Sequence, residues 1–381
     1  MKRMIFYHPA PLSDRPQSGS QVRPIKMLAA FRALGYDVSV ICGSLAQRVQ
    51  RLNALLSQLT DHTLSEYDFL YAESSTAPPI VRDKTLNLVA ALRDLSIFKH
   101  LRKHNIPIGL FYRDIYWRFE HYKKNIDWHK RMVMEPLFRY ELHLYNRVLD
   151  YIFLPSIKMI KAFPTTWTLD RVASLPPACD LPDLEPIHTM PTQPMTPSLG
   201  LLYVGGIQPP MYDIRPVLRV VRELPNVNLM IVCRSKEWTA YGDMYRPLLA
   251  ANMQVVHVHG TELAGLYQQA EVSLLYFMPD KYRDFAVPVK MFEAIGYGKP
   301  VIASSGTAVA TFVERESAGW VATSQEQLAQ LLVQLRDNPD QVRARQNHVR
   351  QLRTRHTWEA RAHRVAELLT TVRVNREALD G

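Results

Sequence analysis

Short apolar strands alternate with helical segments through most of the chain, and this alternation limits the folds open to it. The pattern begins with a strand at residues 4–8, a Pro-, Ser- and Gly-rich loop at 9–20, a helix at 22–34 and a strand at 37–42. A strand–helix–strand unit returns the chain to the same edge of a sheet, so its two strands run parallel. The sequence therefore predicts an α/β protein.

The alternation continues in two halves of the chain. Further strands are predicted at residues 67–72, 108–112 and 150–156, and then at 199–206, 228–233, 254–260, 271–277, 300–303 and 320–322. Helices are predicted at residues 46–59, 86–103, 128–149, 214–223, 261–270, 325–335 and 339–372. Each half is thus expected to form its own parallel sheet with helices.

A proline-rich stretch separates the two halves. Seven prolines between residues 176 and 197 exclude regular elements there, as expected of a domain boundary. We predict an N-terminal Rossmann-like domain at 1–180, a linker at 181–198 and a C-terminal Rossmann-like domain at 199–360. A closing helix at 361–381 is predicted to pack towards the N-terminal domain.

Composition is that of a globular protein rather than of a membrane-spanning or secreted one. The 381 residues are 47% hydrophobic and 22% charged, which suits two soluble domains. Cys42, Cys179 and Cys233 are far apart in the sequence, which indicates a reducing compartment without a disulfide framework. No run of about 18 apolar residues predicts a transmembrane helix, and the basic N-terminus has too short an apolar run for a signal peptide. We therefore expect a cytoplasmic protein.

Almost the whole net charge of +10 belongs to the first half, where residues 1–180 hold 25 Lys and Arg against 16 Asp and Glu. Such an excess suggests an anionic partner: nucleic acid, anionic lipid headgroups or a phosphorylated sugar acceptor. Residues 116–145 add many aromatic side chains to this charge, a combination that favours a membrane interface or single-stranded nucleic acid. A packed helix with a solvated basic face explains the same pattern. We expect a packed helix over 128–149, preceded by an interfacial segment.

Residues 286–304 combine a helix begun by Pro288, a stop at Gly296 and Gly298, and a buried strand. Lys290 and Glu293 lie three residues apart on one face of this helix, near its N-terminal end. They suit a nucleotide site, with Lys290 on a phosphate and Glu293 on ribose hydroxyl groups. Spacing alone favours an ordinary surface ion pair, because such pairs are common.

Other candidate site residues follow the predicted strands, where ligands bind in parallel sheets. Asp114, next to Arg113, is placed to act as a general base, and equally to pair with Arg113 or cap the next turn. The remaining candidates are the loop residues Ser18, Gly19 and Ser20, together with Glu73, Gly205, Gly206, Arg234, His259, Gly260 and Tyr276.

These motifs resemble the GT-B glycosyltransferases, and among them the retaining family 4 (group 1). The resemblance is carried by the Glu293 helix with the following Gly298–Ala303 segment, by Leu202–Gly206, by His259–Gly260 and by residues 150–156. It implies two doubly wound domains that face a central cleft, with a C-terminal helix that crosses back. Many family members carry a second glutamate eight positions before the first, where this chain has Phe285. The donor sugar and the stereochemical outcome are therefore left open.

The order Tyr276, Lys290, Glu293 also resembles the membrane-associated glucuronosyltransferase of xanthan synthesis, although Val289 stands where that enzyme has a Met. In that enzyme a Tyr and a Met-Lys pair hold the nucleotide, and an Asp of the N-terminal domain is the base. Asp114 is the positional match to that Asp.

The resemblance implies transfer of a sugar from a nucleotide-sugar, with a UDP-sugar first, to a glycan or lipid-linked sugar acceptor in bacterial surface polysaccharide synthesis. Capsule, lipopolysaccharide and exopolysaccharide are the expected products. Lys290, Arg234 and the Gly205–Gly206 turn would hold the diphosphate, and Glu293 the ribose. Tyr276 and His259–Gly260 would flank the base. No Asp-x-Asp motif occurs, so no metal and no other cofactor is expected.

The sugar acceptor is expected against the basic first half, with Asp114 as catalytic base. Ser18, Gly19, Ser20, Glu73 and Arg113 would form the loop around the acceptor or the donor sugar. Contact with the inner face of the plasma membrane follows from the same resemblance and charge.

Two alternatives remain. One is another GT-B enzyme, such as a nucleotide-sugar epimerase or a phosphorylase. The other is a non-enzymatic membrane- or nucleic-acid-binding protein. Charge alone does not explain the second half of the chain, so an enzyme without a nucleic-acid partner is favoured.

Overall fold

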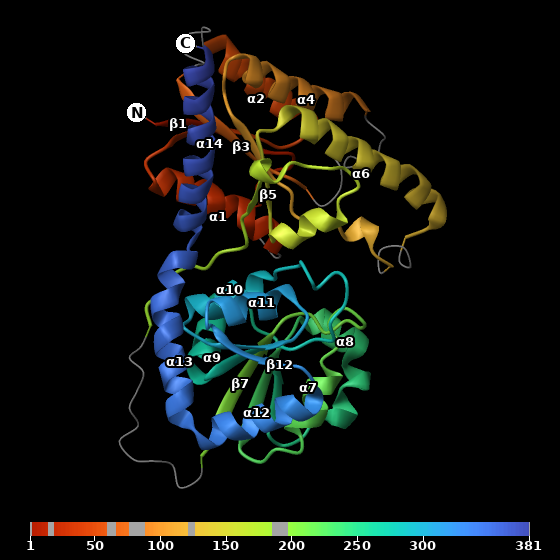
Figure 1. Ribbon diagram of the computed structural model, residues 1–381. Helices are drawn as coiled ribbons and strands as arrows, with labels where there is room; N and C mark the ends of the chain where they lie inside the picture. The colour runs from red at the N-terminus through yellow and green to blue at the C-terminus, as the bar shows by residue number, and fades with distance from the viewer. Residues whose placement is uncertain are drawn as a thin grey trace. The chain divides into compact units, whose positions relative to one another are not determined.

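The computed structural model describes residues 2–13, 19–58, 66–75, 88–120, 126–184 and 197–380. The chain forms two compact units, of which unit 1 comprises Met1–Pro177 with Trp358–Gly381 and unit 2 comprises Ala178–Thr357. Each unit contains a six-stranded parallel sheet with helices on both faces (Figure 1). The predicted fold class, α/β with two doubly wound domains, is confirmed.

The sheet of unit 1 has the strand order β2-β1-β3-β4-β5-β6. Its strands are β1 (Arg3–His8), β2 (Asp37–Cys42), β3 (Tyr67–Glu73), β4 (Ile108–Phe111), β5 (Tyr151–Leu154) and β6 (Val172–Ser174). Five of them match predicted strands. The sixth, β6, was missed because three residues are too few to show a period of two.

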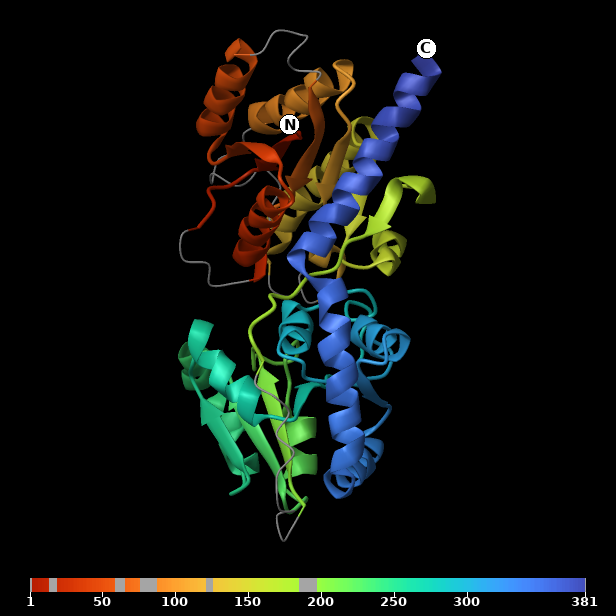
Figure 2. The same cartoon turned by 90° about the vertical axis from the view of Figure 1, so that its left-hand side faces the viewer.

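Helices cover both faces of this sheet. They are α1 (Gly19–Ala33), α2 (Leu45–Gln58), α4 (Leu88–Lys103), α6 (Trp128–Val148) and α14 (Trp358–Asp380). Helices α1 and α14 pack together on one face, where α14 also contacts β3, and α4 packs with α6 on the other (Figure 2). The predicted loop at 9–20 is too long, because α1 already begins at Gly19.

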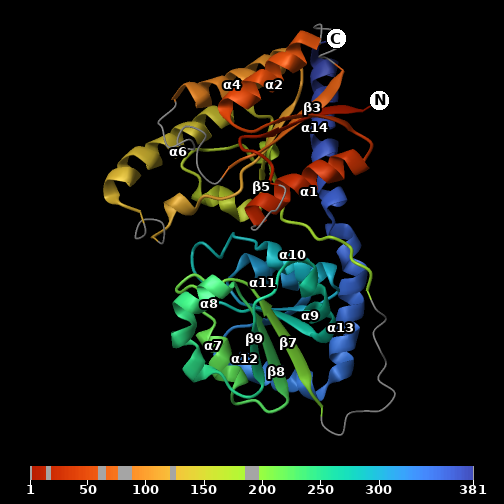
Figure 3. The same cartoon turned by 180° about the vertical axis from the view of Figure 1, so that it is seen from behind.

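The sheet of unit 2 has the order β12-β11-β10-β7-β8-β9. Its strands are β7 (Leu199–Val204), β8 (Val227–Val232), β9 (Met253–Val256), β10 (Val272–Leu275), β11 (Val301–Ser304) and β12 (Gly319–Ala322), seen from behind in Figure 3. All six agree with predicted strands. The chain builds outward from β7 to β9 and then returns to place β10 beside β7. The carboxyl ends of β7 and β10 therefore mark the switch point at which doubly wound sheets bind ligands.

Alternate strand residues build a separate core on each face of this sheet. Leu201 and Tyr203 join one buried cluster, whereas Leu202 and Val204 join the other. The first cluster packs against α7 (Arg215–Val221) and α12 (Gln325–Asp337). The second packs against α9 (Leu263–Gln269), α10 (Val289–Gly296), α11 (Ala308–Arg315) and α13 (Pro339–Leu352). Helix α8 (Ser235–Tyr241) follows β8.

The prediction of one helix over residues 339–372 is wrong. Helix α13 ends at Leu352, a 3₁₀ turn spans Arg353–His356, and α14 starts at Trp358. Between them, the carbonyl oxygen of His356 accepts a hydrogen bond from the Cys179 amide, and Thr357 forms a β-bridge with Cys179. These bonds hold Thr357 in an extended conformation, which interrupts the helix. Unit 2 ends at this residue.

Candidate active site

Helix α10 presents the predicted nucleotide-binding pair. Pro288 precedes the helix as its N-cap residue. Phe292 and Ile295 are fully buried, and each contributes about 1.5–3 kcal/mol relative to exposure. Gly298 ends the helix in the left-handed region, at φ +68°, where the amides of Gly298 and Lys299 bond back to the last turn. The buried stripe leaves Lys290 and Glu293 on the outer face of α10.

Lys290 and Glu293 form an ion pair on α10. The Nζ atom of Lys290 lies 2.5 Å from Oε2 of Glu293, and the two side chains are 38% and 24% exposed. Both side chains are thus partly exposed to solvent, on the helix that follows β10 in the chain. The geometry agrees with a surface ion pair and with a nucleotide-binding pair.

A tight turn with two glycines follows β7 at the switch point. The amide of Gly205 donates to the carbonyl oxygen of Val232 at 3.0 Å, which continues the pairing of β7 with β8. A Cβ atom on Gly205 would lie 2.9 Å from the Tyr203 hydroxyl oxygen, and one on Gly206 would lie 3.0 Å from Tyr212. The Tyr203 hydroxyl also donates to the carbonyl oxygen of Gly206. Only glycine fits this turn without displacing those rings.

Arg234 lies beside this turn and is held by an acid that the sequence did not single out. Arg234 follows β8 and precedes α8, and its Nη1 atom lies 2.7 Å from Oε1 of Glu237. The other carboxylate oxygen of Glu237 accepts a hydrogen bond from the Ile207 amide at 3.0 Å. The spacing of three from Arg234 was the only sequence signal for Glu237. Its bond to Ile207 joins residues thirty positions apart.

Tyr276 and Phe277 follow β10. Tyr276 is buried in the cluster that packs against α7 and α12, on the face of the sheet opposite α10. Burial raises the pKa of Tyr276, and Glu326 adds to the shift. The structure does not bring Tyr276 together with Lys290 and Glu293. Phe277 is partly buried against the same cluster and contacts the rings of Tyr203 and Tyr212, both at 6.0 Å between centroids.

His259 and Gly260 lie on the loop after β9. The His259 side chain is exposed and lies 4.0 Å from Glu262, and Gly260 adopts φ +60°. His257, two residues earlier, contacts Cys233 instead, with Nδ1 2.9 Å from the Cys233 carbonyl oxygen. Burial raises the pKa of the Cys233 thiol to about 11, so that sulfur stays protonated.

At the carboxyl edge of the unit 1 sheet, Glu73 forms a buried ion pair with Arg23. Oε1 of Glu73 lies 3.0 Å from Nε of Arg23 and accepts a hydrogen bond from the Tyr71 hydroxyl at 2.8 Å. The Arg23 and Glu73 side chains are only 4% and 0% exposed, and the Arg23 guanidinium lies 3.5 Å from the Phe111 ring centroid. Glu73, predicted on the sugar-binding loop, is thus enclosed by protein. Arg23 was missed, since nothing in its helix marks a partner fifty residues away.

Arg113 and Asp114 follow β4, the neighbour of β3. The Arg113 amide donates to Oγ of Ser74 at 3.0 Å, and its Nη2 donates to the Ser74 carbonyl oxygen at 3.2 Å. Burial lowers the pKa of Arg113, an effect that the nearby Glu73 opposes. Asp114 is half-buried in the same loop. The structure therefore brings Glu73, Arg113 and Asp114 to one edge of the sheet.

Gly19 and Ser20 open α1 at this edge, and Ser18 lies outside the described residues. Within the described ranges, no group of three or more His, Cys, Asp or Glu side chains is arranged to hold a metal ion. None of the described helices combines the length and the apolar character needed to cross a membrane.

The chain matches known proteins at the level of a domain family and of the fold. Residues 214–367 match a family model described as glycosyl transferase-like. A comparison with curated protein sequences finds no match. Among solved structures, sucrose-phosphate synthase from Thermosynechococcus elongatus aligns with a TM-score of 0.66 and 15% identity over 98% of this chain and 99% of that chain.

Two further structures align over nearly their whole length. HepE from Anabaena, solved in complex with UDP and glucose, gives a TM-score of 0.60 and 13% identity over 97% of this chain and 100% of that chain. WaaG, a glycosyltransferase involved in lipopolysaccharide biosynthesis, gives a TM-score of 0.55 and 16% identity. The alignment covers 97% of this chain and 100% of that chain. The fold is therefore GT-B, and residues 214–367 form a glycosyl transferase-like domain. The predictions of a GT-B fold and of a glycosyltransferase are confirmed.

Proposed function

We propose that the protein transfers a sugar from a UDP-sugar to a glycan or lipid-linked acceptor in the synthesis of a bacterial surface polysaccharide. The observation that carries the proposal is the Lys290–Glu293 pair on α10, which follows the switch point of unit 2. UDP as the nucleotide is supported by HepE, which was solved with UDP and with UDP-glucose. The product class is supported by WaaG and by WaaB, a lipopolysaccharide outer core galactosyltransferase.

The proposed donor site gives a role to both ion pairs and to the glycine turn described above. Lys290 and Arg234 meet the diphosphate, and the amides of the Gly205–Gly206 turn approach it closely. Glu293 turns from Lys290 to the ribose hydroxyl groups. Departure of the nucleoside diphosphate requires neutralisation of its growing charge, which cations and backbone amides can supply without a metal ion.

The sugar acceptor binds to unit 1, where Asp114 removes the proton from the attacking hydroxyl group. Arg113 lies beside Asp114 in the loop after β4. Glu73 does not meet the sugar directly in this proposal, because it is buried against Arg23. It fixes the edge of the sheet from which Arg113 and Asp114 project.

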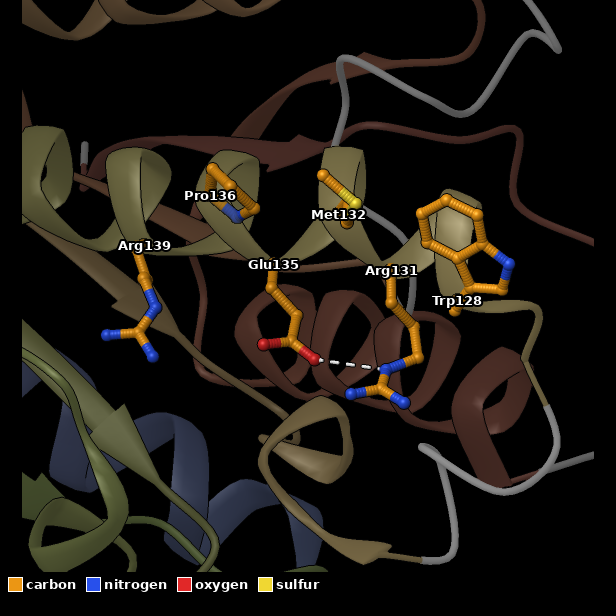
Figure 4. Close-up of a pocket in the computed structure, with 6 residues that line it drawn as sticks. All are labelled: Trp128, Arg131, Met132, Glu135, Pro136 and Arg139. Carbon is orange, nitrogen blue, oxygen red and sulfur yellow. Dashed lines mark hydrogen bonds and ion pairs between the residues drawn. The ribbon is translucent and has the colours of Figure 1, made fainter.

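A membrane contact is proposed for the first turns of α6. Phe138, Leu142 and Tyr145 are buried in the later turns, whereas Trp128 and Met132 in the first turns are 68% and 67% exposed. Large apolar side chains that are exposed together suit a contact with a membrane or a partner. Arg131 and Arg139 line the same groove of about 320 Å³ with Trp128, Met132, Glu135 and Pro136 (Figure 4). Indole, thioether and guanidinium groups together fit the anionic inner face of a membrane.

Transfer with a panel of UDP-, GDP- and dTDP-sugars tests the function. Hydrolysis or transfer with a UDP-sugar in the absence of added metal is the expected result. Conversion of the free nucleotide-sugar without loss of its diphosphate would instead indicate an epimerase. Failure of all the nucleotide-sugars to bind would overturn the proposal.

A further inference from the structure

The two cations proposed to meet the diphosphate are each paired with an acid three residues further along the chain. Lys290 pairs with Glu293, and Arg234 pairs with Glu237 on α8 at 2.7 Å. The helices that carry these pairs, α10 and α8, both belong to unit 2 (Figure 3). Both cations of the proposed donor site are therefore held in neutral pairs.

Glu237 differs from Glu293 because both of its carboxylate oxygens are engaged. Oε1 pairs with Arg234, while Oε2 accepts the hydrogen bond from the Ile207 amide at 3.0 Å. The Glu237 side chain is 18% exposed, whereas that of Arg234 is 69% exposed. The carboxylate is thus fixed by the turn, and the guanidinium is the member of the pair that can move.

The carboxylate also lies directly against the glycine turn. A Cβ atom on Gly206 would lie 3.2 Å from Oε2 of Glu237. On the other side of the turn, the Tyr245 hydroxyl donates to the Ile207 carbonyl oxygen at 2.5 Å. A phosphate that approaches the turn amides therefore comes close to Glu237, which repels it and competes with it for Arg234.

The pair is weak enough to be exchanged. An exposed ion pair shifts the equilibrium between the paired and the separated charges by no more than about five-fold, because water screens the charges. A diphosphate carries more negative charge than one carboxylate and can take over the same guanidinium with two parallel hydrogen bonds. The carboxylate keeps its bond to Ile207 after Arg234 has left.

We propose that Glu237 is a positioning residue that holds Arg234 in the ligand-free protein and releases it to the diphosphate when a nucleotide binds. This inference rests on the proposed donor site. Because Glu237 competes for Arg234, the nucleoside diphosphate binds more weakly than it would to an Arg234 without this partner. Release of the product is thereby favoured. Its second oxygen keeps the Gly205–Ile207 turn in place in both states.

A purely structural role for Glu237 predicts a different result. If the residue served only to hold the turn, Glu237→Ala would weaken nucleotide binding and Glu237→Gln would leave it unchanged. Glu237→Gln separates the roles, because the amide oxygen still accepts from the Ile207 amide while the charge on Arg234 is no longer neutralised. Glu237→Ala removes both interactions.

Calorimetric titration with UDP and with GDP on the full chain tests the inference. We expect Glu237→Gln to bind UDP about three- to five-fold more tightly, and Arg234→Ala to bind it about ten-fold more weakly. In the Arg234→Ala background, Glu237→Gln should add no more than about two-fold, because the two residues act on each other. Glu237→Ala should lower the melting temperature, which Glu237→Gln should leave nearly unchanged.

Asp340→Asn is the matched control. It breaks another pair of the same spacing in unit 2, with Arg343 Nη2 2.5 Å from Asp340 Oδ1 on α13, and should leave UDP binding unchanged. Weaker or unchanged binding by Glu237→Gln would overturn the inference while leaving the donor site intact. Wild-type protein that binds neither UDP nor GDP would overturn the donor site, and the inference with it.

Discussion

The carboxyl edges of the two sheets carry charged pairs of opposite character. In unit 1, Arg23 and Glu73 are almost fully buried and join α1 to β3. In unit 2, Lys290 with Glu293 and Arg234 with Glu237 lie on helix surfaces that solvent reaches. A buried pair is expensive to break and holds the fold, whereas an exposed pair contributes little stability and can exchange its partner for a ligand. The same residue types therefore hold the fold at one edge and, in the proposed function, bind the donor at the other.

The largest effect is expected from breaking the buried pair. Glu73→Ala leaves the Arg23 guanidinium buried without its acid and should lower the free energy of unfolding by about 3–5 kcal/mol. Urea unfolding, with the free energy extrapolated to water, measures this loss. Glu66→Ala is the matched control, since Glu66 pairs with Arg3 at 2.9 Å on the surface of the same unit.

Glu66→Ala should lower the free energy of unfolding by only about 0–1 kcal/mol. Equal losses for Glu73→Ala and Glu66→Ala would contradict the comparison between buried and exposed pairs. Replacing both partners, with Arg23→Met and Glu73→Leu together, should recover most of the stability, because no uncompensated charge remains.

A second large effect concerns the rate of transfer. Asp114→Asn should lower kcat by about 10²–10⁴, the usual contribution of a general base, and should leave UDP affinity unchanged because Asp114 belongs to unit 1. Steady-state transfer and UDP titration measure the two effects separately. Asp68→Asn, near the start of β3, serves as a control for a lost carboxylate in unit 1. An unchanged kcat would place the base elsewhere.

The fold was predictable from the sequence because its signals are local. The apolar run of β7 and the glycine stops after α1 and α10 lie within a few residues of the elements they define. The break between α13 and α14 escaped prediction, since it depends on bonds from Cys179, far away in the sequence. The three-residue strand β6 was too short to detect.

The candidate site was predictable only in part, because only some of its contacts are local in the sequence. Lys290 and Glu293 signal each other by their spacing, and positions after strands marked Arg113 and Arg234. The contacts of Glu237 with Ile207 and of Arg23 with Glu73 join distant segments that only the folded chain brings together. Tyr276 remains a predicted nucleotide contact that rests on a resemblance, and its side chain lies in the core.

Lys299 sharpens the comparison because it is a buried charge in unit 2, with an exposed fraction of 9%. Burial, with a smaller contribution from Arg350, lowers the pKa of Lys299 from the ordinary 10.5 to about 8, and Glu271 opposes part of the shift. The charged form therefore destabilises the fold below pH 8, and this cost is relieved as the pH rises from about 8 to about 10.5. Lys299→Met should raise the free energy of unfolding at pH 7, on the order of 1–2 kcal/mol.

Urea unfolding at pH 7 and at pH 9.5 measures the effect and its pH dependence. The advantage of Lys299→Met should shrink at the higher pH, because the wild-type lysine is then neutral in the folded state. Lys236→Met, at an exposed position on α8, should change the stability little at either pH. A variant that is less stable than wild type at pH 7 would show that the attraction to Glu271 outweighs the cost of burial.

The smallest effect on stability is expected at the exposed pair of α10. Lys290→Ala should change the free energy of unfolding by no more than about 0.5 kcal/mol, because the pair is screened by solvent. The same change should weaken UDP binding about ten-fold, since it removes a charge-assisted hydrogen bond to a phosphate. Arg364→Ala, which breaks a pair of the same spacing with Glu367 in unit 1, should affect neither quantity. An unchanged UDP affinity in Lys290→Ala would reduce the α10 pair to an ordinary surface ion pair. Exposure of a charged residue would then not be enough to identify it as a ligand-binding residue.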